Sequence, residues 1–118
     1  MSKRMMLIFG VVLASAACAS FPPPTDTVAN SLASMRGAEE IGANNVPQAS
    51  LQLQLAQEEL NKAKKLMADG ENEAAHFMAL RASNDAELAI ALTRENNARV
   101  EADKANQRVD AAKTLETK

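Results

Sequence analysis

The stretch PQASLQLQLAQEELNKAKKLMADGENEAA, residues 47–75, decides the fold of this chain. Pro47 suits the first position of a helix, where its fixed φ and missing N–H cost nothing. The sequence Asp69-Gly70 is a turn signal in which Gly70 can adopt the left-handed conformation. Between them apolar residues recur at alternating spacings of four and three, the heptad pattern of a helix that packs along another helix: Ala49, Leu53, Ala56, Leu60, Ala63 and Met67. The stretch therefore predicts one helix, a chain reversal and the start of another helix.

A shorter helix is predicted before this stretch. Thr25, Asp26 and Thr27 offer side chains that can cap a helix N-terminus. An apolar stripe follows at Val28, Leu32, Met35 and Ala38, and Gly42 with the Asn44-Asn45 pair ends the helix.

The last helix is predicted to be long, because neither proline nor glycine follows Gly70. A helix over residues 71–116 would measure close to 70 Å at about 1.5 Å per residue. Its first part carries alanines on one side and larger residues, including Phe77, Leu80 and Leu88, on the other. Since a helix that is apolar on two sides needs two neighbours, we expect an antiparallel three-helix body over residues 26–93.

Residues 94–118 keep an apolar seam that no other part of the chain is left to cover. Its members lie four and three residues apart and are nearly all alanine: Ala98, Ala102, Ala105, Val109 and Ala112. Small residues allow helices to approach closely but bury little area. This segment is therefore expected to be a solvated helix or to pair with a second copy or a partner, and self-association is the prediction we favour. The predicted fold class is all-α, with the long C-terminal helix projecting as an alanine-rich coiled-coil segment.

The N-terminus has the order of a secretory signal peptide. Lys3 and Arg4 precede an apolar run over residues 5–14, and small residues follow. The run is too short to span a bilayer, which takes about 20 residues. We therefore expect residues 1–17 to be a signal peptide.

The sequence LASAAC, residues 13–18, resembles the lipobox of bacterial lipoproteins, with Ser15 where that family prefers Leu, Val or Ile. The resemblance implies a covalent lipid on Cys18, the only cysteine, and Ala19 resembles the family's signal for transfer to the outer membrane. Cleavage by ordinary signal peptidase after Ala14-Ser15-Ala16 is the alternative. Stable anchoring takes more than one acyl chain, which the family's lipid supplies. Residues 18–25, with Pro22-Pro23-Pro24, are expected to be a lipidated, extended spacer.

Two further resemblances concern the helical part. Residues 31–92, with the turn ADGENEAA and the run RASNDAELA, resemble small bacterial envelope lipoproteins whose helical domain has no known function and often accompanies OmpA-like peptidoglycan-binding modules. The tail DKANQRVDAAKTLETK resembles the end of the murein (Braun-type) alanine-zipper lipoproteins. In that family the terminal lysine is joined to peptidoglycan, which implies the same attachment for Lys118. Glu116-Thr117 departs from the aromatic or basic pair usual there.

The composition argues against an enzyme. One histidine, His76, leaves no metal pair or His-based triad, no glycine-rich phosphate loop occurs, and the net charge of −2 does not suggest nucleic acid. We expect no metal, no catalytic residue and no cofactor beyond the lipid. The favoured function is structural: an outer-membrane lipoprotein facing the periplasm that links the membrane to peptidoglycan or an envelope partner. The alternative is a periplasmic helical adaptor that binds a partner through its alanine seam, without covalent wall attachment.

Overall fold

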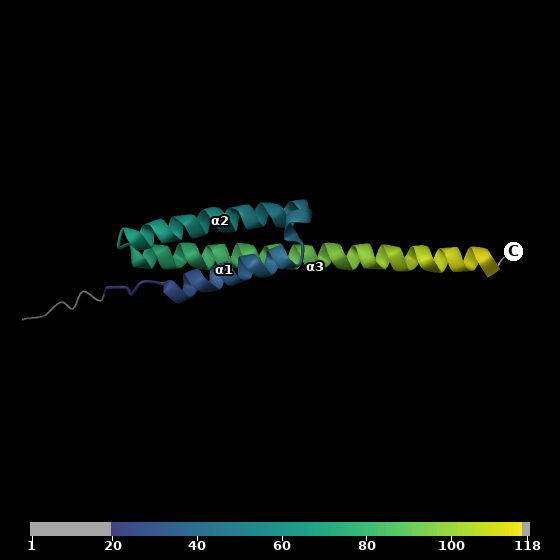
Figure 1. Cartoon of the computed structure of the whole chain (residues 1–118), viewed down its shortest axis with the longest axis horizontal. Helices are drawn as coiled ribbons and strands as arrows, with labels where there is room; N and C mark the ends of the chain where they lie inside the picture. The colour runs from purple at the N-terminus through teal and green to yellow at the C-terminus, as the bar shows by residue number, and fades with distance from the viewer. Residues whose placement is uncertain (1–19, 117–118) are drawn as a thin grey trace, which may run out of the picture.

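The computed structural model describes residues 20–116, and all regular structure in this range is helical. Its elements are α1 (Thr25–Glu40), the short 3₁₀ turn η1 (Ala43–Asn45), α2 (Pro47–Ala68) and α3 (Asn72–Glu116). Helix α2 runs antiparallel to α1 and α3, and α3 continues well past the other two (Figure 1). The predicted antiparallel three-helix arrangement with a long C-terminal helix is confirmed.

The predicted helix boundaries around α2 are confirmed by local geometry. Pro47 is the first residue of α2, preceded by the extended residue Val46. Gly70 adopts φ 82°, and Gly42 after α1 adopts φ 91°. These are left-handed conformations that glycine tolerates without steric cost, so both chain reversals fall where the sequence permits them.

The predicted side-chain cap of α1 is wrong. The helix begins at Thr25, one residue earlier than the predicted body, and Pro24 occupies the N-cap position without a side-chain hydrogen bond. The carbonyl of Pro24 accepts a hydrogen bond from the Val28 amide (3.0 Å). The Thr27 hydroxyl instead lies 3.1 Å from His76 Nδ1 on α3. A tertiary contact therefore takes the hydroxyl that the sequence assigned to capping.

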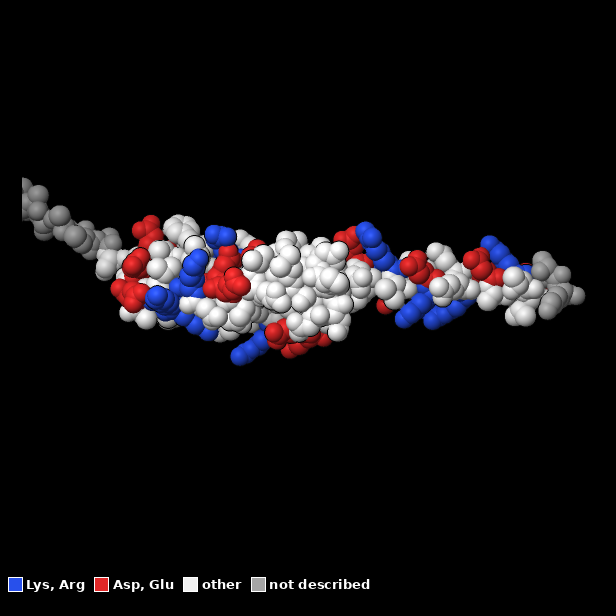
Figure 2. All heavy atoms as spheres, turned by 90° about the horizontal axis from the view of Figure 1, so that it is seen from above, with Lys and Arg blue, Asp and Glu red and all other residues white. Residues whose placement is uncertain are grey.

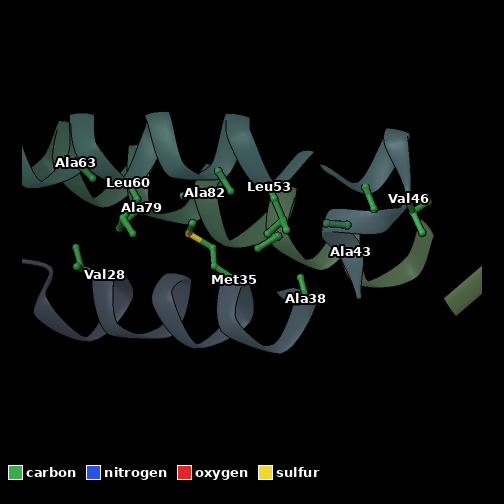
Figure 3. Close-up of a cluster of buried hydrophobic side chains, with 14 residues drawn as sticks. Val28, Met35, Ala38, Ala43, Val46, Leu53, Leu60, Ala63, Ala79 and Ala82 are labelled. Carbon is green, nitrogen blue, oxygen red and sulfur yellow. The ribbon is translucent and has the colours of Figure 1, made fainter. Parts of the chain in front are cut away.

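The core between the helices is built mainly of alanine (Figure 3). Leu60 is the largest fully buried side chain, and Met35 and Leu53 are almost fully buried. Most of the remaining buried positions of the long helices are alanine, which lets the helix backbones lie close together: Ala38, Ala49, Ala56, Ala63, Ala75, Ala79, Ala82, Ala86 and Ala89. The predicted rows of α1 and α2 are buried, except that Leu32 and Met67 are only half-buried.

Ser31 is buried where α1 crosses α3. Its hydroxyl lies within hydrogen-bond distance of the Thr27 carbonyl in α1 and of the Ala79 carbonyl in α3. Both of these oxygens belong to the backbone, so the buried hydroxyl is satisfied without another polar side chain. Sequence periodicity did not identify this position as part of the core.

The expectation that both apolar sides of α3 are covered is wrong. The alanine side is buried, whereas Phe77, Leu80 and Leu88 remain 55%, 40% and 44% exposed. Both α1 and α2 pack against the alanine side, because short side chains leave room for two helices over one arc of α3. The larger residues consequently point away from the core.

Candidate partner interface

The predicted seam lies on the projecting part of α3. Every residue from 94 to 116 is exposed, including the five seam residues, and Val109 keeps 51% of its surface. Thr93 is the last buried residue of the helix, with its hydroxyl donating to the Ala89 carbonyl at 2.7 Å. Within residues 20–116, no element covers the seam.

The seam and the exposed large residues of the body lie on one face of α3. At about 100° per residue, Phe77, Leu80, Leu88 and Ala91 point to the side opposite the buried alanines, and the seam continues in the same direction. We call this continuous surface the outer face of α3: Phe77, Leu80, Leu88, Ala91, Ala98, Ala102, Ala105, Val109 and Ala112. All nine residues are exposed. The sequence carries the signal for this surface in both halves of α3, although it predicts that the half within the body is covered.

Two polar residues interrupt the outer face. Asn84 lies between Leu80 and Leu88, and Glu95 lies between Ala91 and Ala98. The Glu95 carboxylate accepts a hydrogen bond from the Arg99 guanidinium at 2.6 Å, one helical turn away. The ion pair holds the Glu95 carboxylate against the next turn of the helix, so that Ala91 and Ala98 on either side stay accessible.

A groove between α2 and α3 contains the most perturbed carboxyl group. Glu59 Oε1 lies 2.7 Å from the Arg81 guanidinium, while Oε2 is buried without a hydrogen-bond partner in the described chain. Burial raises the pKa of the Glu59 carboxyl, and the negative charge of Asp85 adds to that rise, against a lowering by Arg81. Leu55 and Met78 also line this groove.

A second groove lies where the body gives way to the projecting helix. It has a volume of about 250 Å³ and is lined by Val46 and Gln48 on one side and by Leu92, Glu95 and Arg99 on the other. The neighbouring half of α2 is uncharged, since no charged residue occurs over residues 41–57. Figure 2 shows this white surface between the charged end of the body and the charged projecting helix.

The chain entering α1 is attached to the start of α3. Asn72 Nδ2 donates to the Phe21 carbonyl at 2.9 Å. The Phe21 ring lies 5.3 Å from the His76 ring, and His76 lies 5.7 Å from Phe77. His76, the only histidine, is half-buried and contacts both the spacer and α1. The spacer therefore leaves the body at a fixed place, at the end opposite the projecting helix.

The structure does not locate the other predicted sites. Cys18, Ala19 and Lys118 lie outside the described residues, as does the predicted signal peptide. Among residues 20–116 no helix is long and apolar enough to cross a membrane. The same residues contain no cluster of His, Cys, Asp or Glu suited to a metal ion.

Comparison with known families identifies the helical region. The sequence model described as Domain of unknown function (DUF4398) matches residues 26–105. The chain belongs to this family. The family region begins one residue inside α1, spans the body and includes the seam as far as Ala105. No curated protein and no solved structure matches the chain.

Proposed function

We propose that this protein is a non-enzymatic structural lipoprotein that links the bacterial outer membrane to peptidoglycan or to an envelope partner. One observation carries the proposal: the spacer and the C-terminus of α3 lie at opposite ends of an elongated molecule (Figure 1). Helix α3 alone has 45 residues, or about 67 Å. A tether needs its two attachment points separated in this way.

The membrane end of the proposed tether is Cys18. The lipobox-like sequence before it and the sorting residue Ala19 support a lipid-anchored, periplasm-facing protein of the outer membrane. Ser20–Pro24 precedes α1 without helical structure, and Phe21 is held against Asn72 and His76. A lipid at Cys18 would therefore lie close to the fixed end of the body.

The wall end of the proposed tether is Lys118. The tail resembles that of the murein lipoproteins, and α3 is helical to Glu116, only two residues earlier. The terminal side chain would thus be presented at the tip of a rod, away from the body. All residues from 94 to 116 are exposed, which favours access of a transpeptidase to this end of α3.

The experiment is performed on cell-wall sacculi boiled in detergent. We would probe for the protein before and after lysozyme digestion, in the wild type and in a chain lacking Lys118. Release only after lysozyme, together with loss of the signal in the deletion, is the expected result. Protein found entirely in the detergent wash would refute wall attachment.

The exposed outer face of α3 favours a second candidate, the helical adaptor. In that case Ala102→Glu would abolish binding of the partner protein, whereas deletion of Lys118 would not, because the partner would contact the outer face and not the C-terminal end. A tether would show the opposite pattern. A Cys18→Ser variant, which should move from the membrane to the soluble periplasmic fraction, tests the anchor that both candidates share.

A further inference from the structure

We propose that the outer face of α3 pairs with the same face of a second copy of this chain, with the two helices antiparallel. The proposal does not rest on lipidation or on wall attachment. The sequence predicts self-association through the seam alone. The structure extends the contact surface to the whole outer face, and the charge pattern gives the orientation of the two helices.

The orientation follows from a row of residues that runs along one edge of the outer face and shares Leu80 with it. They recur every seven residues along α3, are all exposed, and begin and end with leucine: Leu80, Glu87, Arg94, Glu101, Arg108 and Leu115. In the heptad register of the seam this row corresponds to the g positions, which face g positions of an antiparallel partner. No ion pair involves its four charged members within residues 20–116.

When the second copy runs in the opposite direction, each charged residue of the row faces a residue of opposite charge, and each leucine faces a leucine. In an antiparallel pair Leu80 meets Leu115 of the second copy, Glu87 meets Arg108, and Arg94 meets Glu101. Symmetry generates each contact twice, so four opposite-charge pairs and two leucine contacts form together. The same register places Leu88 opposite Ala105, which matches a larger residue with a small one, and Ala91 opposite Ala102, where two small residues let the helices approach closely.

A parallel pair would have the opposite electrostatics. There the g row faces the e row, which contains Arg99 and Lys113. Arg94 would then face Arg99 of the second copy, and Arg108 would face Lys113. Like charges across a helix interface are destabilising, so the charge pattern selects the antiparallel arrangement.

The geometry allows this pair to form. The outer face is opposite the buried alanine side, so α1 and α2 of each copy lie away from the contact. On a straight helix, residues spaced by seven drift about 20° around the axis with each repeat, and the row and the seam drift together. A left-handed supercoil of the two helices removes this drift. Both stripes can therefore follow the partner helix over their whole length.

An antiparallel pair has a consequence for the proposed tether. The two bodies would lie at opposite ends, with their spacer ends roughly 70 Å apart at 1.5 Å per residue. Two copies anchored in one membrane would lie along its surface, whereas a copy linked to the wall stands upright. Pairing and wall linkage are then alternative states of one molecule, and each is tested separately.

The first test uses charge reversal in the full chain carrying Cys18→Ser, kept in mild detergent, with sedimentation equilibrium as the measurement. Arg94→Glu should raise the dissociation constant about tenfold at low salt, because two attractive pairs become repulsive. Arg94→Glu combined with Glu101→Arg should restore it. Lys104→Glu, an equal charge change outside the face, is the matched control and should have no effect. Tighter pairing in Arg94→Glu would overturn the antiparallel orientation, since it would relieve the Arg94–Arg99 contact of a parallel pair.

The second test measures the register directly. Ala91→Cys and Ala102→Cys are prepared as separate variants with different tags in the Cys18→Ser chain, mixed and oxidised. Antiparallel pairing should give the mixed disulfide, because like cysteines would lie about 16 Å apart along the axis, beyond disulfide reach. Disulfides between identical variants alone would overturn the orientation. A chain that remains monomeric at about 1 mM, an effective concentration typical of tethered pairs, would overturn the proposal itself.

Discussion

At the scale of single residues, helix α3 places its small side chains inside and several of its large ones outside. Ala79, Ala82 and Ala86 are fully buried, while Phe77 and Leu88 on the same helix are about half exposed. Close helix packing explains the inversion, because short side chains on this side of α3 let the backbones of α1 and α2 approach it. Burial of alanine removes little area from water, so stability depends on how closely the backbones approach.

Gly37 is a residue at which stability can be increased. It lies within α1, and a Cβ atom added there would meet Ile90 Cδ1 at an ordinary contact distance of 3.8 Å. Gly37→Ala should therefore raise the free energy of unfolding by about 0.5–1 kcal/mol, because glycine loses more conformational freedom in a helix. Urea denaturation measures the change. Gly70→Ala is the matched control and should lower stability, since φ there is 82°.

The Glu59 carboxyl should make stability depend on pH. Its folded-state pKa is raised, first by burial and then by Asp85, so its contribution to stability is present in acid and is lost as the pH rises through the titration of Glu59. Glu59→Gln, which cannot ionise, should be more stable than the wild type at neutral pH, and the difference should disappear in acid. Thermal unfolding across this range measures it.

The exposed neighbour Glu58 supplies the control for this experiment. Glu58→Gln removes the same charge from the same turn of α2, at an exposed side chain on the rim of the groove. An equal gain in stability from both variants at neutral pH would show that net charge, and not the burial of Glu59, causes the effect.

At the scale of elements, α3 is one continuous helix with two environments. Residues 75–93 pack against α1 and α2, whereas none of residues 94–116 is buried. The projecting part continues a helix that the body has already nucleated, which avoids the cost of initiating a new one. The projecting part can therefore unfold locally while the body stays folded, whereas the first half of α3 unfolds only together with α1 and α2.

Amide hydrogen exchange should resolve these two halves. Amides of residues 79–93 are expected to exchange only through global unfolding, and those of residues 98–116 through low-energy local opening. If the outer face pairs as proposed, protection of residues 98–112 should increase with protein concentration while that of the body stays constant. Uniform protection along α3 in the dilute chain would contradict the division.

At the scale of the whole molecule, the three-helix body and the projecting part of α3, residues 94–116, which we call the rod, share one continuous helix. We expect their stabilities to be independent, because no residue of the rod is buried against the body. The Phe21 contacts with Asn72 and His76 hold the spacer at one end, and α3 extends from the other. The charged residues of the projecting helix alternate in sign along its surface (Figure 2). This pattern keeps the rod solvated wherever the outer face is not covered.

Lys104→Pro should separate the rod from the body. Proline in a helix interior removes one hydrogen bond and costs about 3 kcal/mol locally. Since Lys104 is exposed and remote from the core, helical circular dichroism should fall while the unfolding midpoint of the body in dilute solution remains unchanged. A large drop in that midpoint would show that the rod contributes to the stability of the body.

The sequence by itself determined the three helices, because their limits are set by local chemistry at Pro47 and Gly70 and by the lack of any helix breaker afterwards. It also determined the buried row of α2, since Leu53, Ala56 and Leu60 follow one helical period. Only the tertiary structure decided which side of α3 is covered. Both sides are apolar, and periodicity reports that a face is apolar but not whether another helix reaches it. Backbone approach over the short alanine side settles that choice, and it also places Phe77 and Leu88 in line with the seam.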